Sequence, residues 1–168
     1  MTTLYLVRHG ETPDNARQVL QGQIQGELNE VGIGQAEQVR DQLAGEHFVA
    51  VVASDLHRAI QTAEIIAAPH GLAVATTPLL RERDWGDFTG RYIPDLENAV
   101  FPDNVEPLPA LLERAGRFLD YVRTTYPDQR VLAVGHGIVN KAVQAVLLGK
   151  TMREVVRMTN GEVRVLEV

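Results

Sequence analysis

The sequence predicts an α/β fold in which a mostly parallel central sheet carries helices on both faces. Strand-like apolar runs alternate with helical segments along the chain, which is typical of this fold class. The C-terminal segment GEVRVLEV alternates apolar and polar residues, as a half-exposed edge strand does. No linker, repeat or low-complexity tract divides the sequence, so we expect one domain spanning residues 1–168.

Five segments have the apolar character of strands. They comprise residues 4–7, 48–54, 72–77, 130–135 and 161–168. We expect the first four to be parallel and buried, and the last to be an antiparallel strand at the sheet edge. Such an edge could pair with a second subunit, so a homodimer is one assembly to consider.

Four segments have apolar residues at helical spacing. They follow Asn29, span residues 57–68, begin near Leu108, and pass through Ala142 and Leu147. Asn29 can cap the first helix, and Pro69 and Gly71 should stop the second. Ser54 has the character of an N-cap for the second helix, which would place Arg58 in its first turn.

Composition narrows the class of protein. The formal net charge of −6 argues against broad nucleic-acid or anionic-membrane binding, although a local arginine cluster could still hold a small anion. The absence of cysteine removes disulfides, thiol nucleophiles and thiolate metal sites. No apolar run approaches membrane-spanning length. We therefore expect a soluble, cytoplasmic protein.

Polar residues cluster where the predicted strands end, and ligands of such sheets bind at the carboxyl ends of strands. The residues at these positions are Arg8, His9, Ser54, Asp55, Arg58, Glu82 and His136. Arginine has a planar fork suited to phosphate oxygens, and the glycines beside His9 and His136 allow close approach of a ligand to the backbone. Arg58 near a helix N-terminus would add to the attraction for an anion. The pattern therefore indicates a phosphate site.

The segment LVRHGET at residues 6–12 resembles the signature of the histidine phosphatase superfamily, also called the phosphoglycerate-mutase-like family. Further segments resemble family motifs in the same order: QG at 21–22, SDLHRAIQTA at 54–63, LRERDWGDFTG at 80–90 and VGHG at 134–137. The resemblance covers nearly the whole chain and implies a three-layer α/β/α sandwich, in agreement with the pattern above.

The resemblance implies a role for each matching residue. His9 would be the nucleophile, and Arg8, Arg58 and His136 would form the phosphate pocket. Glu82 would donate a proton to the leaving oxygen and then activate water. The residues that would bind substrate are Thr12, Asn15, Gln21, Gly22 and Gly137. Arginine and histidine supply the positive charge, so we expect no metal and no cofactor.

A histidine nucleophile needs an unprotonated attacking nitrogen, so its other nitrogen should donate to a fixed acceptor. The expected acceptor for His9 is a backbone carbonyl near Gly10.

Departures from the mutase pattern favour a phosphatase acting on a small phosphorylated metabolite. Mutases resembling this chain carry lysine and asparagine where it has Ile93 and Ile138. Residues 91–107 are short and hold one arginine, Arg91, rather than the pair that grips a second anionic group. Their shortness also suggests an open site with little lid. The alternatives are a phosphoglycerate mutase, a catalytically silent binder of phospho-ligands and, ranked lower, a phosphatase of protein phosphohistidine.

Overall fold

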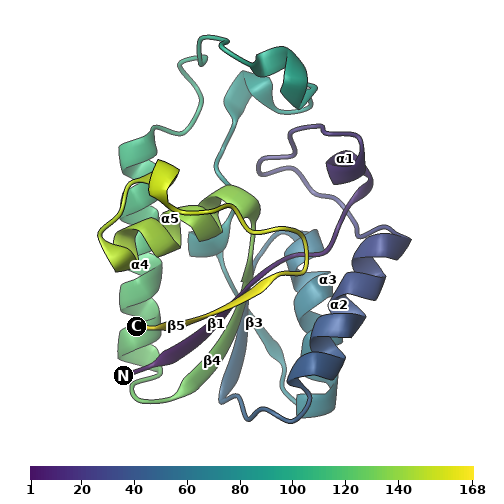
Figure 1. The fold of residues 1–168 in the computed structure, drawn as a ribbon, viewed down its shortest axis with the longest axis vertical. Coiled ribbons are helices and arrows are strands. Elements are labelled where there is room, and N and C mark those ends of the chain that lie inside the picture. Colours follow the sequence, from purple (N-terminus) through teal and green to yellow (C-terminus); the bar gives the residue numbers. More distant parts are fainter.

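A computed structural model describes all 168 residues and contains one five-stranded sheet (Figure 1). The strands are β1 (Thr3–Arg8), β2 (Ala50–Ser54), β3 (Val74–Thr77), β4 (Arg130–Gly135) and β5 (Val163–Glu167). They lie in the order β3-β2-β4-β1-β5. The first four run parallel, and β5 pairs antiparallel with β1 at the edge. The predicted fold class and edge strand are confirmed; the homodimer stays a prediction.

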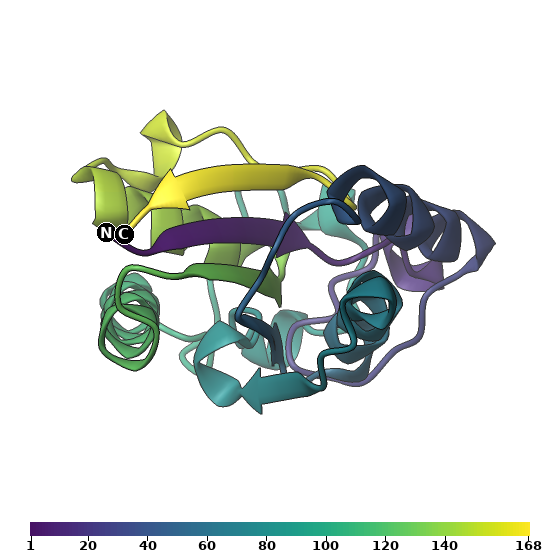
Figure 2. The same cartoon turned by 90° about the horizontal axis from the view of Figure 1, so that it is seen from below.

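Four helices cover the two faces of the sheet: α2 (Glu30–Leu43), α3 (His57–Ala67), α4 (Leu108–Thr125) and α5 (Gly137–Leu148). A fifth, α1 (Pro13–Ala16), lies beyond the carboxyl ends of the strands. Short 3₁₀ turns lie at Ala68–His70, Pro78–Leu80, Gly86–Phe88, Ile93–Leu96 and Met152–Glu154. Helices α2 and α3 cover one face, and α4 and α5 cover the other (Figure 2). None of the helices combines the length and apolarity needed to cross a bilayer.

Successive side chains of a strand point to opposite faces of the sheet, so each central strand contributes to two apolar clusters. In β1, Leu4 and Leu6 pack in the cluster of α4 and α5, whereas Val7 packs in the cluster of α2 and α3. In β4, Val131 belongs to the first cluster and Leu132 to the second. The central strands are thus apolar on both faces, as expected for a covered parallel sheet.

The predicted cap of α2 is confirmed, but the predicted cap of α3 is wrong. Asn29 accepts a hydrogen bond from the backbone N–H of Gly32 at 2.8 Å. The N-cap of α3 is Leu56, not Ser54. The Ser54 hydroxyl accepts instead from the backbone N–H of Leu56, outside the helix. Arg58 still lies in the first turn of α3, because the helix begins one residue before it.

Two glycines allow the loop after β1 to cross the start of α2 closely. A Cβ on Gly10 would overlap the carbonyl of Gly32, and one on Gly32 would overlap the carbonyl of Glu11. Asn29 donates to the Glu11 carboxylate at 2.9 Å, and its backbone N–H donates to the Glu11 carbonyl at 3.0 Å. This crossing fixes the direction in which the chain leaves β1 at His9.

Two segments extend beyond the carboxyl ends of the parallel strands, at the top of Figure 1. They are residues 10–29, which include α1, and residues 80–107. The segments are joined by backbone hydrogen bonds, Leu20 N–H to Arg91 carbonyl at 3.0 Å and Ile93 N–H to Gln18 carbonyl at 2.8 Å. Together they build the surroundings of the site.

Candidate active site

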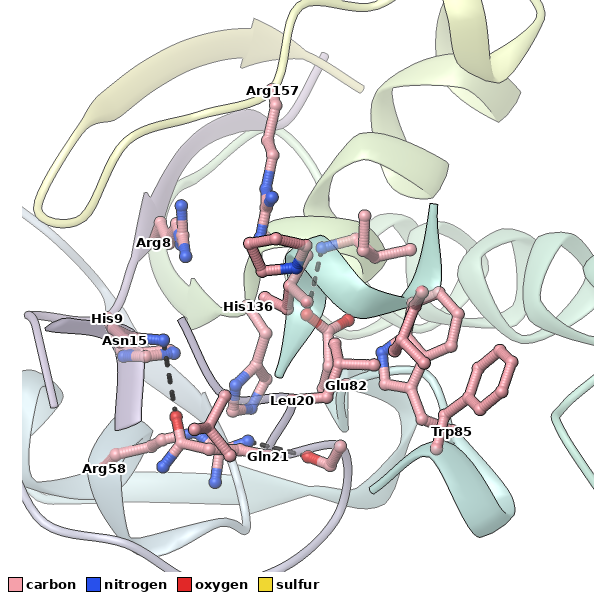
Figure 3. A pocket seen from close by; sticks show the side chains of 18 of the residues that line it. Arg8, His9, Asn15, Leu20, Gln21, Arg58, Glu82, Trp85, His136 and Arg157 are labelled. Carbon is pink, nitrogen blue, oxygen red and sulfur yellow. Dashed lines mark hydrogen bonds between the residues drawn. The ribbon is translucent and has the colours of Figure 1, made fainter. Parts of the chain in front are cut away.

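A cavity of about 480 Å³ lies at the carboxyl ends of β1 and β4, under these two segments (Figure 3). The predicted site residues that line it are Arg8, His9, Asn15, Gln21, Gly22, Arg58, Glu82, His136 and Gly137. They come from the ends of two strands, the first turns of α3 and α5, and the loops above the sheet. Of the residues predicted at the site, Thr12, Ser54 and Asp55 do not line this hollow, and Asp55 forms an ion pair with Arg81.

His9 follows β1 directly and is almost entirely buried. Its Nδ1 lies 2.7 Å from the carbonyl oxygen of Gly10, as expected from the sequence. A carbonyl only accepts, so Nδ1 carries the proton and Nε2 carries the lone pair. Burial and the nearby charges of Arg58 and Arg8 hold the pKa of His9 well below its usual value. His9 is thus a neutral imidazole with a free nitrogen.

His136 follows β4, immediately before α5, and its ring centroid lies 4.9 Å from that of His9. Its Nε2 lies 2.8 Å from the hydroxyl oxygen of Ser54, and both residues are fully buried. Its Nδ1 has no partner in the protein. Burial and the charge of Arg58 hold the pKa of His136 well below its usual value.

The Ser54 hydroxyl selects a tautomer of His136. Its oxygen already accepts from the backbone N–H of Leu56 at 3.2 Å. Since the buried hydroxyl proton needs an acceptor, the arrangement that satisfies both groups is a bond from Ser54 to Nε2 of His136. His136 Nδ1 then carries a proton. A neutral imidazole can therefore donate from Nδ1 to an anion without titrating near neutral pH.

Two buried arginines provide the positive charge. Arg8 donates to the Met158 carbonyl at 2.7 Å, and Arg58 donates to the carbonyls of Ile24 at 2.6 Å and Gly22 at 2.7 Å. Neither guanidinium forms an ion pair with a carboxylate of the chain. Burial lowers the pKa of each to about 10, and the Nε of each has no partner. Buried cations without an anion indicate a site for an anionic ligand.

Glu82 is held at the start of α5. Its Oε1 accepts from the backbone N–H groups of Val139 and Arg83, each at 2.9 Å, and its Oε2 accepts from that of Ile138 at 3.0 Å. The side chain is buried to about nine-tenths, at 9% exposure. The N–H groups of a helix start lack partners within the helix and can orient a carboxyl side chain in this way. One helix start thus orients both His136 and Glu82.

The predicted substrate-side residues divide into two groups. Asn15, Gln21, Gly22 and Gly137 line the cavity, whereas Thr12 is fully buried and does not. The Thr12 hydroxyl donates to Gln21 Oε1 at 2.9 Å and also caps α1 by accepting from the backbone N–H of Asn15. Thr12 therefore orients Gln21 instead of reaching a ligand.

The short segment after Gly90, from which the sequence predicted an open site with little lid, reaches the cavity. The segment after Gly90 contributes Ile93, Pro94, Leu96, Glu97 and Phe101 to the cavity lining. Although the segment is short, its pairing with residues 18–20 places it over the cavity. A long-range pairing of this kind leaves no pattern in the sequence.

Arg157 and an aromatic group at the cavity were not predicted from the sequence. Arg157 precedes β5 and forms no ion pair. Trp85, Phe88 and Phe101 complete one side of the cavity. Trp85 and Phe88 lie inside the segment LRERDWGDFTG, where two aromatic residues at a spacing of three were the available signal.

No three His, Asp or Glu side chains gather in the chain as candidate ligands of a metal ion.

The fold and the cavity define a class of protein: an α/β protein whose strand ends present two neutral imidazoles, two buried arginines and one fixed carboxylate around an anion site. Comparison of the sequence with models of known protein families identifies the same class. The model of the histidine phosphatase superfamily (branch 1) matches residues 4–168, and the chain belongs to this family. The family assignment and its implied fold are confirmed.

Individual relatives include proteins named for two activities. A "Probable phosphoglycerate mutase GpmB" of Yersinia pestis is 35% identical, with 89% of this chain and 76% of the relative aligned. The alpha-ribazole phosphatase of Shigella flexneri has a similar structure, with a TM-score of 0.89, 27% identity, and coverage of 99% of this chain and 90% of that chain. A mycobacterial glucosyl-3-phosphoglycerate phosphatase, solved with VO3, has a TM-score of 0.88 and 27% identity, covering 98% and 92% of the two chains.

Proposed function

We propose that this protein is a metal-independent phosphomonoester hydrolase that acts through a phosphohistidine intermediate on a small phosphorylated metabolite. The observation that carries the proposal is a neutral His9, with Nε2 free, in one cavity with two unpaired buried arginines. The similarity to solved phosphatase structures supports it.

In the first step, His9 Nε2 attacks phosphorus, and the bond from phosphorus to the alcohol oxygen breaks. Arg8, Arg58 and the Nδ1–H of His136 stabilise the charge on the non-bridging oxygens, which is the main requirement of phosphoryl transfer. A protonated Glu82 gives its proton to the leaving oxygen. Oε2 of Glu82 accepts a single backbone hydrogen bond and so retains a lone-pair position for that proton.

In the second step, the Glu82 carboxylate takes a proton from water while the water oxygen attacks phosphorus. The phosphorus–nitrogen bond breaks, inorganic phosphate leaves, and His9 and Glu82 return to their starting states. The Gly10 carbonyl holds the His9 ring in place through both steps because it accepts a hydrogen bond from Nδ1–H throughout.

Hydrolysis is favoured over mutase activity by the cavity lining. Ile93 and Ile138 both line the cavity and cannot hydrogen-bond a reorienting bisphosphate. Phosphoglycerate mutase is the second candidate, favoured by the name of the 35% identical relative and by the unpaired cation of Arg157 at the cavity.

The test is release of inorganic phosphate from a panel of phosphorylated metabolites, with a metal chelator present. We expect release by the wild type and a loss of at least ~10³-fold in His9→Ala, because the nucleophile is gone. The matched control is His47→Ala, which removes an exposed histidine outside the cavity and should leave the rate unchanged. A brief reaction quenched in base should trap a phosphoryl group on His9 in the wild type.

Two other outcomes would reject hydrolysis as the function. Interconversion of phosphoglycerates in the presence of 2,3-bisphosphoglycerate, faster than phosphate release, would establish a mutase. Binding of panel members without turnover of any of them would establish a silent binder.

A further inference from the structure

We infer that the substrate's leaving alcohol carries an apolar ring, and that the part of the cavity beyond Glu82 is a binding subsite for that ring. The inference rests on the proposed function and adds the chemical class of the substrate. We call this part of the cavity the ring subsite; its members are the three aromatic residues Trp85, Phe88 and Phe101, whose rings contact one another.

The direction of the alcohol follows from the positions of the charged groups. The transferred phosphoryl group must contact Arg8, Arg58 and His9, and the bridging oxygen must reach Glu82. In Figure 3, Glu82 lies between His136 on one side and Trp85 on the other. The alcohol therefore continues past Glu82 toward Trp85, into apolar surroundings.

The side chains of the ring subsite are already held in place in the ligand-free protein. The Trp85 and Phe101 rings meet edge to face with centroids 5.8 Å apart, and Phe88 and Phe101 do so at 5.6 Å. The Arg83 guanidinium lies 4.9 Å from the Trp85 ring centroid and 5.4 Å from that of Phe101, and Arg83 Nε donates to the Glu106 carbonyl at 2.9 Å. The aromatic groups are thus held in fixed positions, which limits the entropy lost on binding.

Part of this apolar surface faces solvent in the free protein. Phe101 is 50% exposed and Ile93, which also borders the cavity, is 39% exposed. Covering such surface with an apolar ring is favourable, because it removes apolar area from water on both partners. A small polar alcohol would leave this surface exposed and gain nothing from it.

The rival interpretation is a substrate with a second anionic group bound by Arg157. A Cβ on Gly137 would lie 3.0 Å from Arg157 Nε and 3.3 Å from Arg8 Cζ, so these two guanidinium groups flank the same glycine. The charge of Arg157 also contributes to lowering the pKa of Arg8. Arg157 therefore belongs to the phosphoryl end of the cavity. The guanidinium beside the ring subsite, that of Arg83, stacks on the Trp85 and Phe101 rings, donates to the Glu106 carbonyl and does not line the cavity.

The experiment compares three phosphomonoesters: 2-phenylethyl phosphate, ethyl phosphate and 3-phosphoglycerate. The alcohols of the first two have similar acidity, so their esters differ in the ring and little in intrinsic reactivity. We expect kcat/KM for 2-phenylethyl phosphate to exceed that for ethyl phosphate by about tenfold or more, from burial of the ring. Phe101→Ala should reduce this ratio several-fold.

The matched control is Tyr92→Ala. Tyr92 is an aromatic residue of the same segment, 47% exposed, and it does not line the cavity. Its removal should leave the ratio at the wild-type value. An equal drop in the ratio for both variants would assign the effect to the segment as a whole and overturn the ring subsite.

Two further results separate the inference from the proposed function. Equal kcat/KM for the two alkyl esters, with phosphate released from both, overturns the ring subsite and leaves the hydrolase intact. A preference for 3-phosphoglycerate that is lost in Arg157→Met also overturns it, in favour of a second anionic group. Release of phosphate from none of the three esters and from no member of the metabolite panel rejects the hydrolase itself, and the inference with it.

Discussion

At the scale of single residues, the two histidines of the cavity are both neutral, and their hydrogen-bond partners give both the same tautomer with different nitrogens facing the site. The Gly10 carbonyl keeps the proton of His9 on Nδ1 and frees Nε2 to attack. The Ser54 hydroxyl occupies Nε2 of His136 and leaves Nδ1–H for an anion. In the proposed mechanism one side chain serves as the nucleophile and the other as a donor, because their hydrogen-bond partners differ in capacity.

The role of Ser54 is tested by Ser54→Ala. Without the hydroxyl, His136 loses the group that fixes its tautomer, so binding of vanadate should weaken by about tenfold. The measurement that distinguishes this from general damage is ¹⁵N NMR of His136, which should shift from one tautomer toward a mixture. Ser54→Thr keeps the hydroxyl and should restore the signal. An unchanged His136 spectrum in Ser54→Ala would show that the serine does not set the tautomer.

At the scale of elements, the site depends on how closely the loop after β1 approaches α2. The carbonyl of Glu11 lies where a Cβ of Gly32 would be, and the Gly32 carbonyl lies where a Cβ of Gly10 would be. The side chain of Asn29 ties the same loop to the helix start. Since the peptide after β1 carries both His9 and its acceptor carbonyl, a shift of α2 would move the nucleophile.

Two glycines of α2 provide a matched pair for testing this contact. A methyl group on the Cα of Gly34 would have no neighbour within 4 Å, so Gly34→Ala should stabilise the helix by up to about 1 kcal/mol. Gly32→Ala adds the same methyl group against backbone atoms, and it should lower the free energy of unfolding by roughly 2 kcal/mol. Urea denaturation of both variants measures the difference. Equal stability of the two would mean that the loop moves aside at little cost.

At the scale of the whole molecule, an acidic chain of net charge −6 encloses a cationic cavity. Arg8, Arg58 and His136 face an anion site under cover of residues 10–29 and 80–107. Two carboxylates, Glu82 and Glu97, line the cavity, and backbone N–H groups hold Glu82 there; the excess of carboxylates lies outside the cavity. Burying cations without a counter-ion costs free energy in the ligand-free protein. Binding of an anion offsets this cost, so it should raise the free energy of unfolding.

Stability should fall as the pH drops below the usual histidine pKa. The pKa values of His9 and His136 are lowered in the folded protein, so between pH 6.5 and about 5 the unfolded chain binds up to two more protons. Their contribution to stability is present above pH 6.5 and is lost below it, at up to about 2.7 kcal/mol per pH unit. The lowered pKa values of Asp55 and Glu162 act only at lower pH, below the usual carboxyl range.

Urea unfolding between pH 5 and 7.5 measures this slope, and His9→Gln should reduce it by about half. A free energy of unfolding that is flat across this range would contradict neutral buried histidines.

The sequence by itself determined the strand–helix order, the position of both histidines at strand ends, the Asn29 cap and the gathering of arginine, histidine and glutamate at those strand ends. These features depend on residues near one another in the chain: an apolar run, a capping side chain, a histidine beside a glycine. Only the tertiary structure decided that Ser54 bonds His136 instead of capping α3, that Thr12 orients Gln21, and that Phe101 and Arg157 reach the cavity. Each of these depends on contacts between segments far apart in the chain, which local periodicity does not encode.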